Sequence, residues 1–175
     1  VVPTAENIAL AAFHRLEPGV DRQHATTPNI ARPEELQPVT IVLGSPEPFD
    51  SVEVRPAGGR HPRQEERFHP FWGRVREPLG QDLVAHTAGL VFLSDYLVIR
   101  SPFEPGTGAG AGLRCFTLEH TIWFHRPITA DRWMLFDAVP LTQSGGRYLS
   151  RGTVHDDHGL LLASFVQEGL IRPNR

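Results

Sequence analysis

Two polar side chains lie in apolar stretches of the chain, and both belong to types that take part in chemistry. Asp95 lies inside a predicted helix, where an ionised carboxylate must be paired, hydrogen-bonded or neutralised. It is therefore either a structural or a catalytic residue. Gln167 follows the apolar run 160–166, and a buried amide needs partners for its N–H donors and its carbonyl oxygen. The alternative for Gln167 is an ordinary strand residue that faces the solvent.

Thr117 is a third candidate, in a predicted strand over residues 113–124. Strand side chains alternate between two faces, so Thr117 is expected to share its face with Glu119, Thr121 and Trp123. Taken alone it is unremarkable, because threonine is a favoured strand residue.

The histidines and glycines give weaker signals. His120 and His125 are five residues apart in the same predicted segment, which places them on opposite faces and prevents them from sharing a metal ion. His155 and His158 flank a predicted turn, and two ligands there are weak evidence for zinc. The glycines of residues 106–112 lack dinucleotide-fingerprint spacing and predict a flexible loop. We therefore predict neither a metal nor a cofactor.

Composition excludes several classes of protein. The 175 residues include 17 basic residues, all of them arginine, and 20 acidic ones, which are scattered without a patch for nucleic acid. The absence of lysine removes Schiff-base chemistry. No stretch is apolar enough to cross a bilayer, and the single Cys115 excludes an internal disulfide. We expect a cytoplasmic protein with no membrane or nucleic-acid partner, whose abrupt start suggests that upstream residues are missing.

One apolar helix and six strands are predicted around these candidates. The helix covers residues 81–99, and apolar residues cover most of its circumference, which predicts a buried helix. Two strands precede the helix and four follow it, at residues 49–56, 68–77, 113–124, 132–139, 146–155 and 160–171. The pattern predicts an α+β fold in which one antiparallel sheet wraps one helix.

The N-terminal part has a different character. Residues 7–16 are partly apolar and end at a turn signal, which predicts a strand. Residues 20–48 are rich in proline and lack a sustained period, so they predict a linker, with one short helical turn near residues 33–36.

Three sequence blocks in fixed order carry a family resemblance. They are LEHTIWFHRP at 118–127, SGGR at 144–147 and ASFVQEGLIR at 163–172. Together they resemble the C-terminal hot-dog domain of the type II acyl-CoA thioesterases. Upstream, AAFHRLEPG at 11–19 resembles the last strand of that family's first hot-dog domain. The resemblance implies three parts: residues 1–19 from an otherwise missing first domain, an interdomain linker over 20–48, and a C-terminal hot-dog domain over 49–175.

The resemblance also assigns roles to the three candidates. The family's catalytic group is an Asp on the helix, a Thr on the following strand and a Gln on the last strand. The contexts LSDY at 93–96, FTLEH at 116–120 and FVQEG at 165–169 look like these sites. Asp95 would then be the general base, and Thr117 and Gln167 would orient the attacking water without a covalent intermediate.

Two further parts of such a site are hypotheses. Backbone N–H groups near residues 80–83 are reasonable donors to the oxyanion. Arginine suits bidentate recognition of phosphate, so four arginines are candidates for contacts to coenzyme A, although a solvated surface role is the simpler interpretation for each. They are Arg126, Arg147, Arg151 and Arg172.

The resemblance predicts an acyl-CoA thioesterase that releases a free fatty acid and coenzyme A. Full-length members carry two hot-dog domains in one chain, so a second domain is expected as partner: a missing N-terminal part, a separate chain, or a second copy in a homo-oligomer. A non-catalytic half-domain for assembly or acyl binding is the alternative. A hot-dog hydratase is weaker, because the Asp-to-His spacing of such enzymes is not evident.

Overall fold

The computed structural model describes residues 9–12, 17–40, 50–57, 69–98 and 113–173. Its elements are a 3-10 helix η1 (Pro33–Glu35), strands β1 (Val52–Pro56) and β2 (Phe71–Val75), helix α1 (Leu83–Val98), and strands β3 (Leu113–Phe124), β4 (Met134–Ser144), β5 (Arg147–Asp156) and β6 (Leu161–Pro173). The predicted helix, the six strands and the turn near residues 33–36 are confirmed. Of the strand predicted over residues 7–16, only 9–12 are described, and they lie in no strand.

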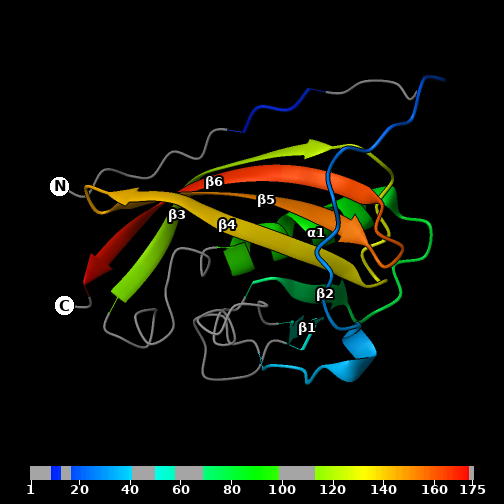
Figure 1. Ribbon diagram of the computed structural model, residues 1–175, viewed down its shortest axis with the longest axis horizontal. Helices are drawn as coiled ribbons and strands as arrows, with labels where there is room; N and C mark the ends of the chain where they lie inside the picture. Colours follow the sequence, from blue (N-terminus) through cyan, green and yellow to red (C-terminus); the bar gives the residue numbers. More distant parts are fainter. Residues whose placement is uncertain (1–8, 13–16, 41–49, 58–68, 99–112, 174–175) are drawn as a thin grey trace.

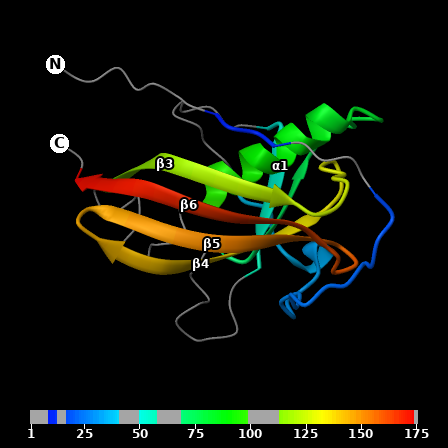
Figure 2. The ribbon, with the colours of Figure 1, turned by 90° about the horizontal axis from the view of Figure 1, so that it is seen from above.

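The six strands form one antiparallel sheet in the order β1-β2-β4-β5-β6-β3. Figure 1 shows β4, β5 and β6 arching over α1, with β1 and β2 on its other side, and Figure 2 shows α1 running along the sheet. A two-residue turn joins β4 to β5, in which Gly145 and Gly146 have φ angles of 60° and 71°. Positive φ at both central positions is the geometry of a type I′ hairpin turn, which glycine adopts without strain.

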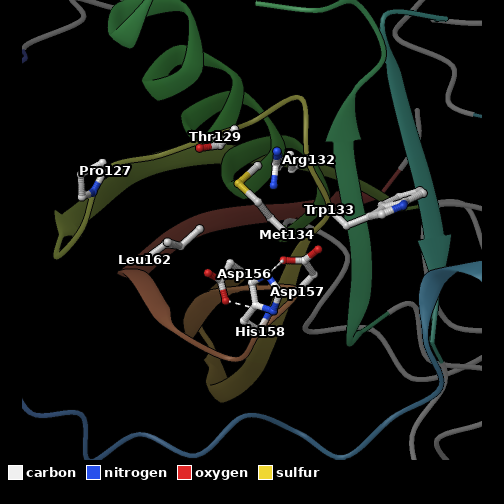
Figure 3. A pocket seen from close by; sticks show the side chains of 9 residues that line it. All are labelled: Pro127, Thr129, Arg132, Trp133, Met134, Asp156, Asp157, His158 and Leu162. Atoms are coloured by element: carbon white, nitrogen blue, oxygen red, sulfur yellow. Dashed lines mark hydrogen bonds and ion pairs between the residues drawn. The ribbon is translucent and has the colours of Figure 1, made fainter. Parts of the chain in front are cut away.

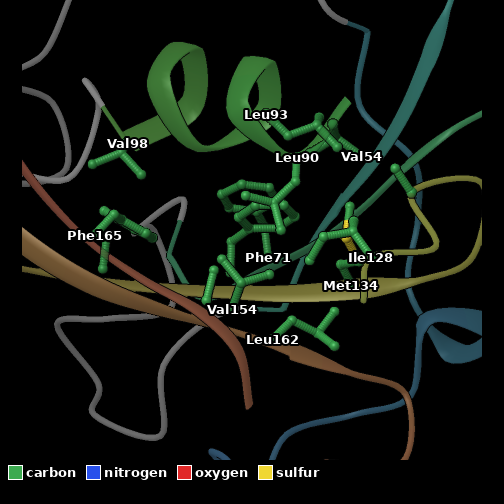
Figure 4. Packing of buried hydrophobic residues seen from close by; sticks show 14 of the residues in the cluster. Val54, Phe71, Leu90, Leu93, Val98, Ile128, Met134, Val154, Leu162 and Phe165 are labelled. Carbon is green, nitrogen blue, oxygen red and sulfur yellow. The ribbon is translucent and has the colours of Figure 1, made fainter. Parts of the chain in front are cut away.

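The core lies between α1 and the concave face of the sheet (Figure 4). Leu90 and Leu93 of the helix pack among side chains that include Phe71 and Phe136, whose rings stack with centroids 4.8 Å apart. Full burial of one such side chain contributes about 1.5–3 kcal/mol. Asp82 directly precedes the helix, and its carboxylate accepts hydrogen bonds from the amides of residues 84 and 85, as an N-cap does.

The prediction that α1 is buried around its circumference is wrong. Leu83, Val84, Ala88 and Val91 are exposed, and the side chain of Val84 reaches 80 %. Val84, Ala88 and Val91 follow the i, i+4, i+7 spacing of one helix face. The apolar residues of α1 are therefore divided between two faces. One packs on the core, and the other, made by Val84, Ala88 and Val91, is called the outward apolar face below.

Residues 17–40, for which we keep the name linker although the predicted interdomain linker over 20–48 stays a prediction, cross the convex face of the sheet (Figure 1). The Gln23 side chain donates to the carbonyl oxygen of Gly159 at 2.9 Å and accepts from the amide of Leu161 at 2.6 Å. The Trp72 indole donates to Ala31 O at 3.0 Å. These contacts join the linker to β2 and to the β5–β6 connection, so it covers side chains on this face of the sheet.

A buried carboxylate fixes the η1 end of the linker. Glu53 is buried and accepts hydrogen bonds from Arg55 and Arg74. Burial would raise the pKa of Glu53, but these guanidinium groups outweigh that effect and keep its pKa below the usual value. Arg55 also donates to the carbonyl oxygens of Pro33 and Leu36, at 2.8 and 3.1 Å. One arginine thus connects β1 to both ends of η1.

Candidate active site

The fold brings the three predicted residues into one hydrogen-bonded cluster. Asp95 lies in the last turns of α1, Thr117 in β3, and Gln167 in β6, which pairs with β3. The Thr117 hydroxyl donates to Asp95 Oδ1 at 2.9 Å, and Gln167 Nε2 donates to the same oxygen at 2.5 Å. Gln167 Nε2 also lies 3.1 Å from Thr117 Oγ1 and 3.1 Å from the Asp95 carbonyl oxygen. Their catalytic role stays a prediction.

The cluster leaves one carboxylate oxygen unused. Asp95 Oδ1 accepts from both partners, whereas Oδ2 receives no hydrogen bond from the part of the chain that the structure describes. Gln167 is fully buried and Asp95 is half-buried. A carboxylate fixed through one oxygen can bind a water molecule with the other, which is the arrangement that a general base requires.

A β-bulge in β3 corrects the predicted set of neighbours of Thr117. Thr117 pairs with Gly169 and Glu119 with Glu168, so Leu118 is an extra residue on β3. The bulge exchanges the two faces of the strand beyond it. Thr117 therefore shares the helix-facing side with the later residue His120, and not with the predicted neighbours Glu119, Thr121 and Trp123.

Tyr148 is a contributor that sequence reasoning missed. Its hydroxyl donates to Gln167 Oε1 at 3.3 Å, and its side chain is buried. Burial, with smaller effects from Cys115 and Asp95, raises the pKa of Tyr148, so the phenol remains a donor. Because Oε1 is taken by Tyr148, the amide nitrogen of Gln167 is directed at Asp95. The available signal was positional: Tyr148 pairs with Gly169, two residues from Gln167.

Gly169 gives Tyr148 its place. A Cβ atom added to Gly169 would lie 2.3–2.6 Å from three atoms of the Tyr148 side chain. Carbon atoms do not approach so closely, so any side chain at position 169 would displace the ring. Gly169 thereby leaves room for the Tyr148 ring, and the Tyr148 hydroxyl in turn orients the amide of Gln167.

The histidines and the tryptophan of the first block lie in different surroundings. His120 Nε2 is 3.0 Å from the Oγ atom of Ser94, and Ser94 immediately precedes Asp95 in the chain. Burial lowers the pKa of His120, although the charge of Asp95 opposes this. His125 Nε2 is 2.9 Å from Ser164 Oγ, and about half of the Trp123 side chain is exposed. Of these three residues, His120 lies next to the cluster.

The oxyanion donors suggested near residues 80–83 are too distant to serve Asp95 of the same chain. Twelve residues of α1 separate Leu83 from Asp95, which corresponds to about 18 Å at the usual rise per residue. The contacts of three of the four candidate phosphate-binding arginines are internal. Arg126 binds Asp21 and Leu161 O, Arg147 binds Glu168, and Arg172 binds Gly146 O. The role of these arginines in binding coenzyme A stays a prediction.

A separate pocket of about 260 Å³ lies between residues 127–134 and the β5–β6 connection (Figure 3). None of the three cluster residues lines it. Within the described ranges, no group of three or more histidine, cysteine or acidic side chains is placed to bind a metal ion. Those ranges also contain no helix that is long and apolar enough to span a membrane.

Comparison with known proteins identifies similar sequences and folds. The family model of the acyl-CoA thioesterase C-terminal domain matches residues 20–171. Human acyl-coenzyme A thioesterase 8 is 26 % identical over 94 % of this chain and 59 % of its own length. Acyl-CoA thioesterase 2 of Haemophilus influenzae is 29 % identical over 93 % of this chain and 62 % of its own length. The chain thus spans about three fifths of these curated relatives.

Solved structures confirm the predicted hot-dog fold. The acyl-CoA thioesterase II TesB2 of Mycobacterium marinum superimposes with a TM-score of 0.71 at 28 % identity, over 90 % of this chain and 59 % of its own. A hot-dog protein of unknown function from Alicyclobacillus acidocaldarius gives a TM-score of 0.65 at 19 % identity, over 91 % of this chain and 59 % of its own.

Proposed function

The chain belongs to the acyl-CoA thioesterase C-terminal domain family, and on that premise we propose that it supplies the catalytic side chains that hydrolyse a fatty acyl-CoA to free fatty acid and coenzyme A. The observation that supports this activity best is the cluster in which Thr117 and Gln167 both donate to Oδ1 of Asp95. No described residue donates a hydrogen bond to Oδ2, which can then bind a water molecule.

The proposed reaction begins with a water molecule that donates a hydrogen bond to Asp95 Oδ2. As the water oxygen attacks the thioester carbonyl carbon, Asp95 accepts a proton from it. The tetrahedral intermediate then collapses, the carbon–sulfur bond breaks, and the proton passes from Asp95 to the departing sulfur. Thr117 and Gln167 orient the carboxylate, and with it the water, throughout these steps. The carboxylate is regenerated, and no covalent enzyme intermediate forms.

The partner of this site is proposed to be a second hot-dog domain. In the sheet of described strands β3 lies at an edge, and its apolar residues Phe116, Leu118, Trp123 and Phe124 are about half exposed. The outward apolar face of α1 is exposed as well. A long apolar edge strand and an apolar helix face are typical of surfaces that bind another protein unit. The second domain would be an N-terminal part of the same protein, a separate chain, or a second copy.

Hydrolysis of a chain-length series of acyl-CoAs, measured with the oligomer mass in the same preparation, tests this function. Asp95→Asn should lower kcat by about 100-fold or more, the range of a lost general base. The exposed Asp50, far from the cluster in sequence, gives the matched control Asp50→Asn, which should keep full activity. Undiminished hydrolysis by folded Asp95→Asn would contradict the mechanism.

The alternative function has its own outcome in the same assay. A non-catalytic half-domain would bind acyl-CoA, or a partner domain, without turnover in any assembly state. The exposed edge of β3 is the observation that favours this alternative. A single-domain monomer that hydrolyses acyl-CoA at full rate would instead contradict the proposed second domain. The cytoplasmic location stays a prediction.

A further inference from the structure

The hydrogen bonds of Ser94 define the tautomer of His120. Ser94 Oγ donates to the carbonyl oxygen of Val91 at 3.0 Å, as serine often does within a helix. Its only proton is then used, so at the 3.0 Å contact with His120 the serine oxygen accepts and Nε2–H donates. His120 therefore carries a proton on Nε2. Because its buried Nδ1 meets no acceptor among the described residues and burial lowers the pKa of the ring, the imidazole is neutral with an unprotonated Nδ1.

This arrangement excludes a serine nucleophile. A serine activated by histidine would have to donate its proton to the imidazole, which is the reverse of the bond found here. Ser94 is also fully buried on the helix. The pair has the residue types of a nucleophile and a base, but its geometry is that of a tether between α1 and β3.

The other ring nitrogen of His120 adds no stabilising contact. Nδ1 is buried and has no hydrogen-bond partner among the residues that the structure describes, and an unpaired buried nitrogen costs free energy. The ring packs at 5.8 Å from the ring of Phe165, in surroundings that suit an apolar side chain. An apolar residue would avoid the unpaired nitrogen, so the contribution specific to histidine is the Nε2–H bond to Ser94.

That bond acts next to the carboxylate of the cluster. Ser94 immediately precedes Asp95, and His120 pairs across the strands with Gln167, which donates to Asp95. We propose that His120 is a positioning residue: its Nε2–H fixes Ser94, and thereby places the Asp95 carboxylate between Thr117 and Gln167. This role rests on the proposed thioesterase function, because it concerns the geometry of its base.

The variants His120→Leu and His120→Gln separate the effect of the hydrogen bond to Ser94 from the effect of side-chain packing. His120→Leu removes Nε2–H together with the unpaired Nδ1, so the thermal midpoint should be equal to or higher than that of the parent protein. Its kcat should nevertheless fall by about 10-fold or more, since small displacements of a reacting group have effects of this size, while KM changes little. His120→Gln supplies an N–H at a similar reach and should recover most of kcat. His158→Gln, at an exposed turn residue, is the matched control and should leave both constants unchanged.

Ser94→Ala tests whether His120 acts through the serine. It should lower kcat to a similar extent, and the double variant Ser94→Ala/His120→Leu should be no slower than the slower single variant. Parent-like kcat in folded His120→Leu would overturn the proposal. So would losses that multiply in the double variant, because the two residues would then act independently.

Nitrogen NMR of isotopically labelled histidine separates failure of this inference from failure of the proposed function. His120 should show a protonated Nε2 and an unprotonated Nδ1, with signals that disappear in His120→Leu and shift in Ser94→Ala. A protonated Nδ1 would overturn the tether whether or not the protein hydrolyses acyl-CoA. If the tautomer is as described but the parent protein and Asp95→Asn are both inactive, the proposed function fails while the tether stands.

Discussion

Replacing His155 by leucine should stabilise the fold, and more strongly at acid pH. His155 is fully buried in β5, outside the main core cluster, and neither ring nitrogen has a hydrogen-bond partner in the described part of the chain. It pairs with Leu135 of β4 and Leu161 of β6, and the linker binds the backbone of Leu161 through Gln23. Leucine has a similar volume and no polar atom. Removing an unsatisfied buried polar group is worth about 1–3 kcal/mol at neutral pH.

The pH dependence follows from the direction of the pKa shift. Burial lowers the pKa of His155, with the charge of Asp156 opposing it in part. The unfolded chain, whose histidine pKa is about 6.5, therefore binds a proton before the folded protein does. Stability is lost as the pH falls below that value, by up to about 1.4 kcal/mol per pH unit. At pH 5 the additional advantage of the leucine variant is at most about 2 kcal/mol.

Urea unfolding followed by tryptophan fluorescence at about pH 7.5 and pH 5 measures both contributions. The other histidines are present in both proteins, so the difference between parent and variant isolates His155. His24→Leu is the matched control, since the exposed His24 has no buried ring nitrogen and its replacement should leave the urea midpoint nearly unchanged. A gap between parent and His155→Leu that is the same at both pH values would refute the reasoning, because the ring would then be solvated or paired. Lower stability of the variant at pH 7.5 would refute it too.

Two substitutions test how Gln167 is oriented. Tyr148→Phe leaves Gln167 Oε1 without its donor and should lower kcat several-fold and stability by about 1–2 kcal/mol, measured by thiol release and urea unfolding; unchanged kcat would show that the amide needs no such contact. Gly169→Ala places a methyl group against the Tyr148 ring and should lower both the thermal midpoint and kcat. Gly19→Ala, which meets no atom within 4 Å, should change neither, and an equal effect of the two alanines would contradict the steric argument.

The elements and the cluster were predictable because they depend on local pattern and on residue identity. Alternation located the strands, and a run of apolar residues located the helix. Asp95, Thr117 and Gln167 were identified by the family contexts around them, and the structure brings their side chains together.

The remaining features depend on contacts between distant parts of the chain. The bulge at Leu118 was not predicted, because alternation was assumed to continue unbroken through β3. Hydropathy does not distinguish an apolar face that packs on the core from one that faces outward, so Val84 was assigned to the interior. The bond between Gln23 and Leu161, the β6 partner of His155, likewise joins residues 138 positions apart, which no local pattern reveals.

The bulge at Leu118 also limits how the edge strand can move. An uninterrupted strand can slip by two residues and still present the same face, but a ladder with an extra residue has one register only. Slippage of β3 along β6 would carry Leu118 past Gly169 and break the bond between Thr117 and Asp95. β3, one of the two edge strands of the described sheet, is therefore held in one register by the bulge and the cluster together. A domain that pairs with the edge of β3 that no described strand occupies would be aligned, through that register, with the carboxylate.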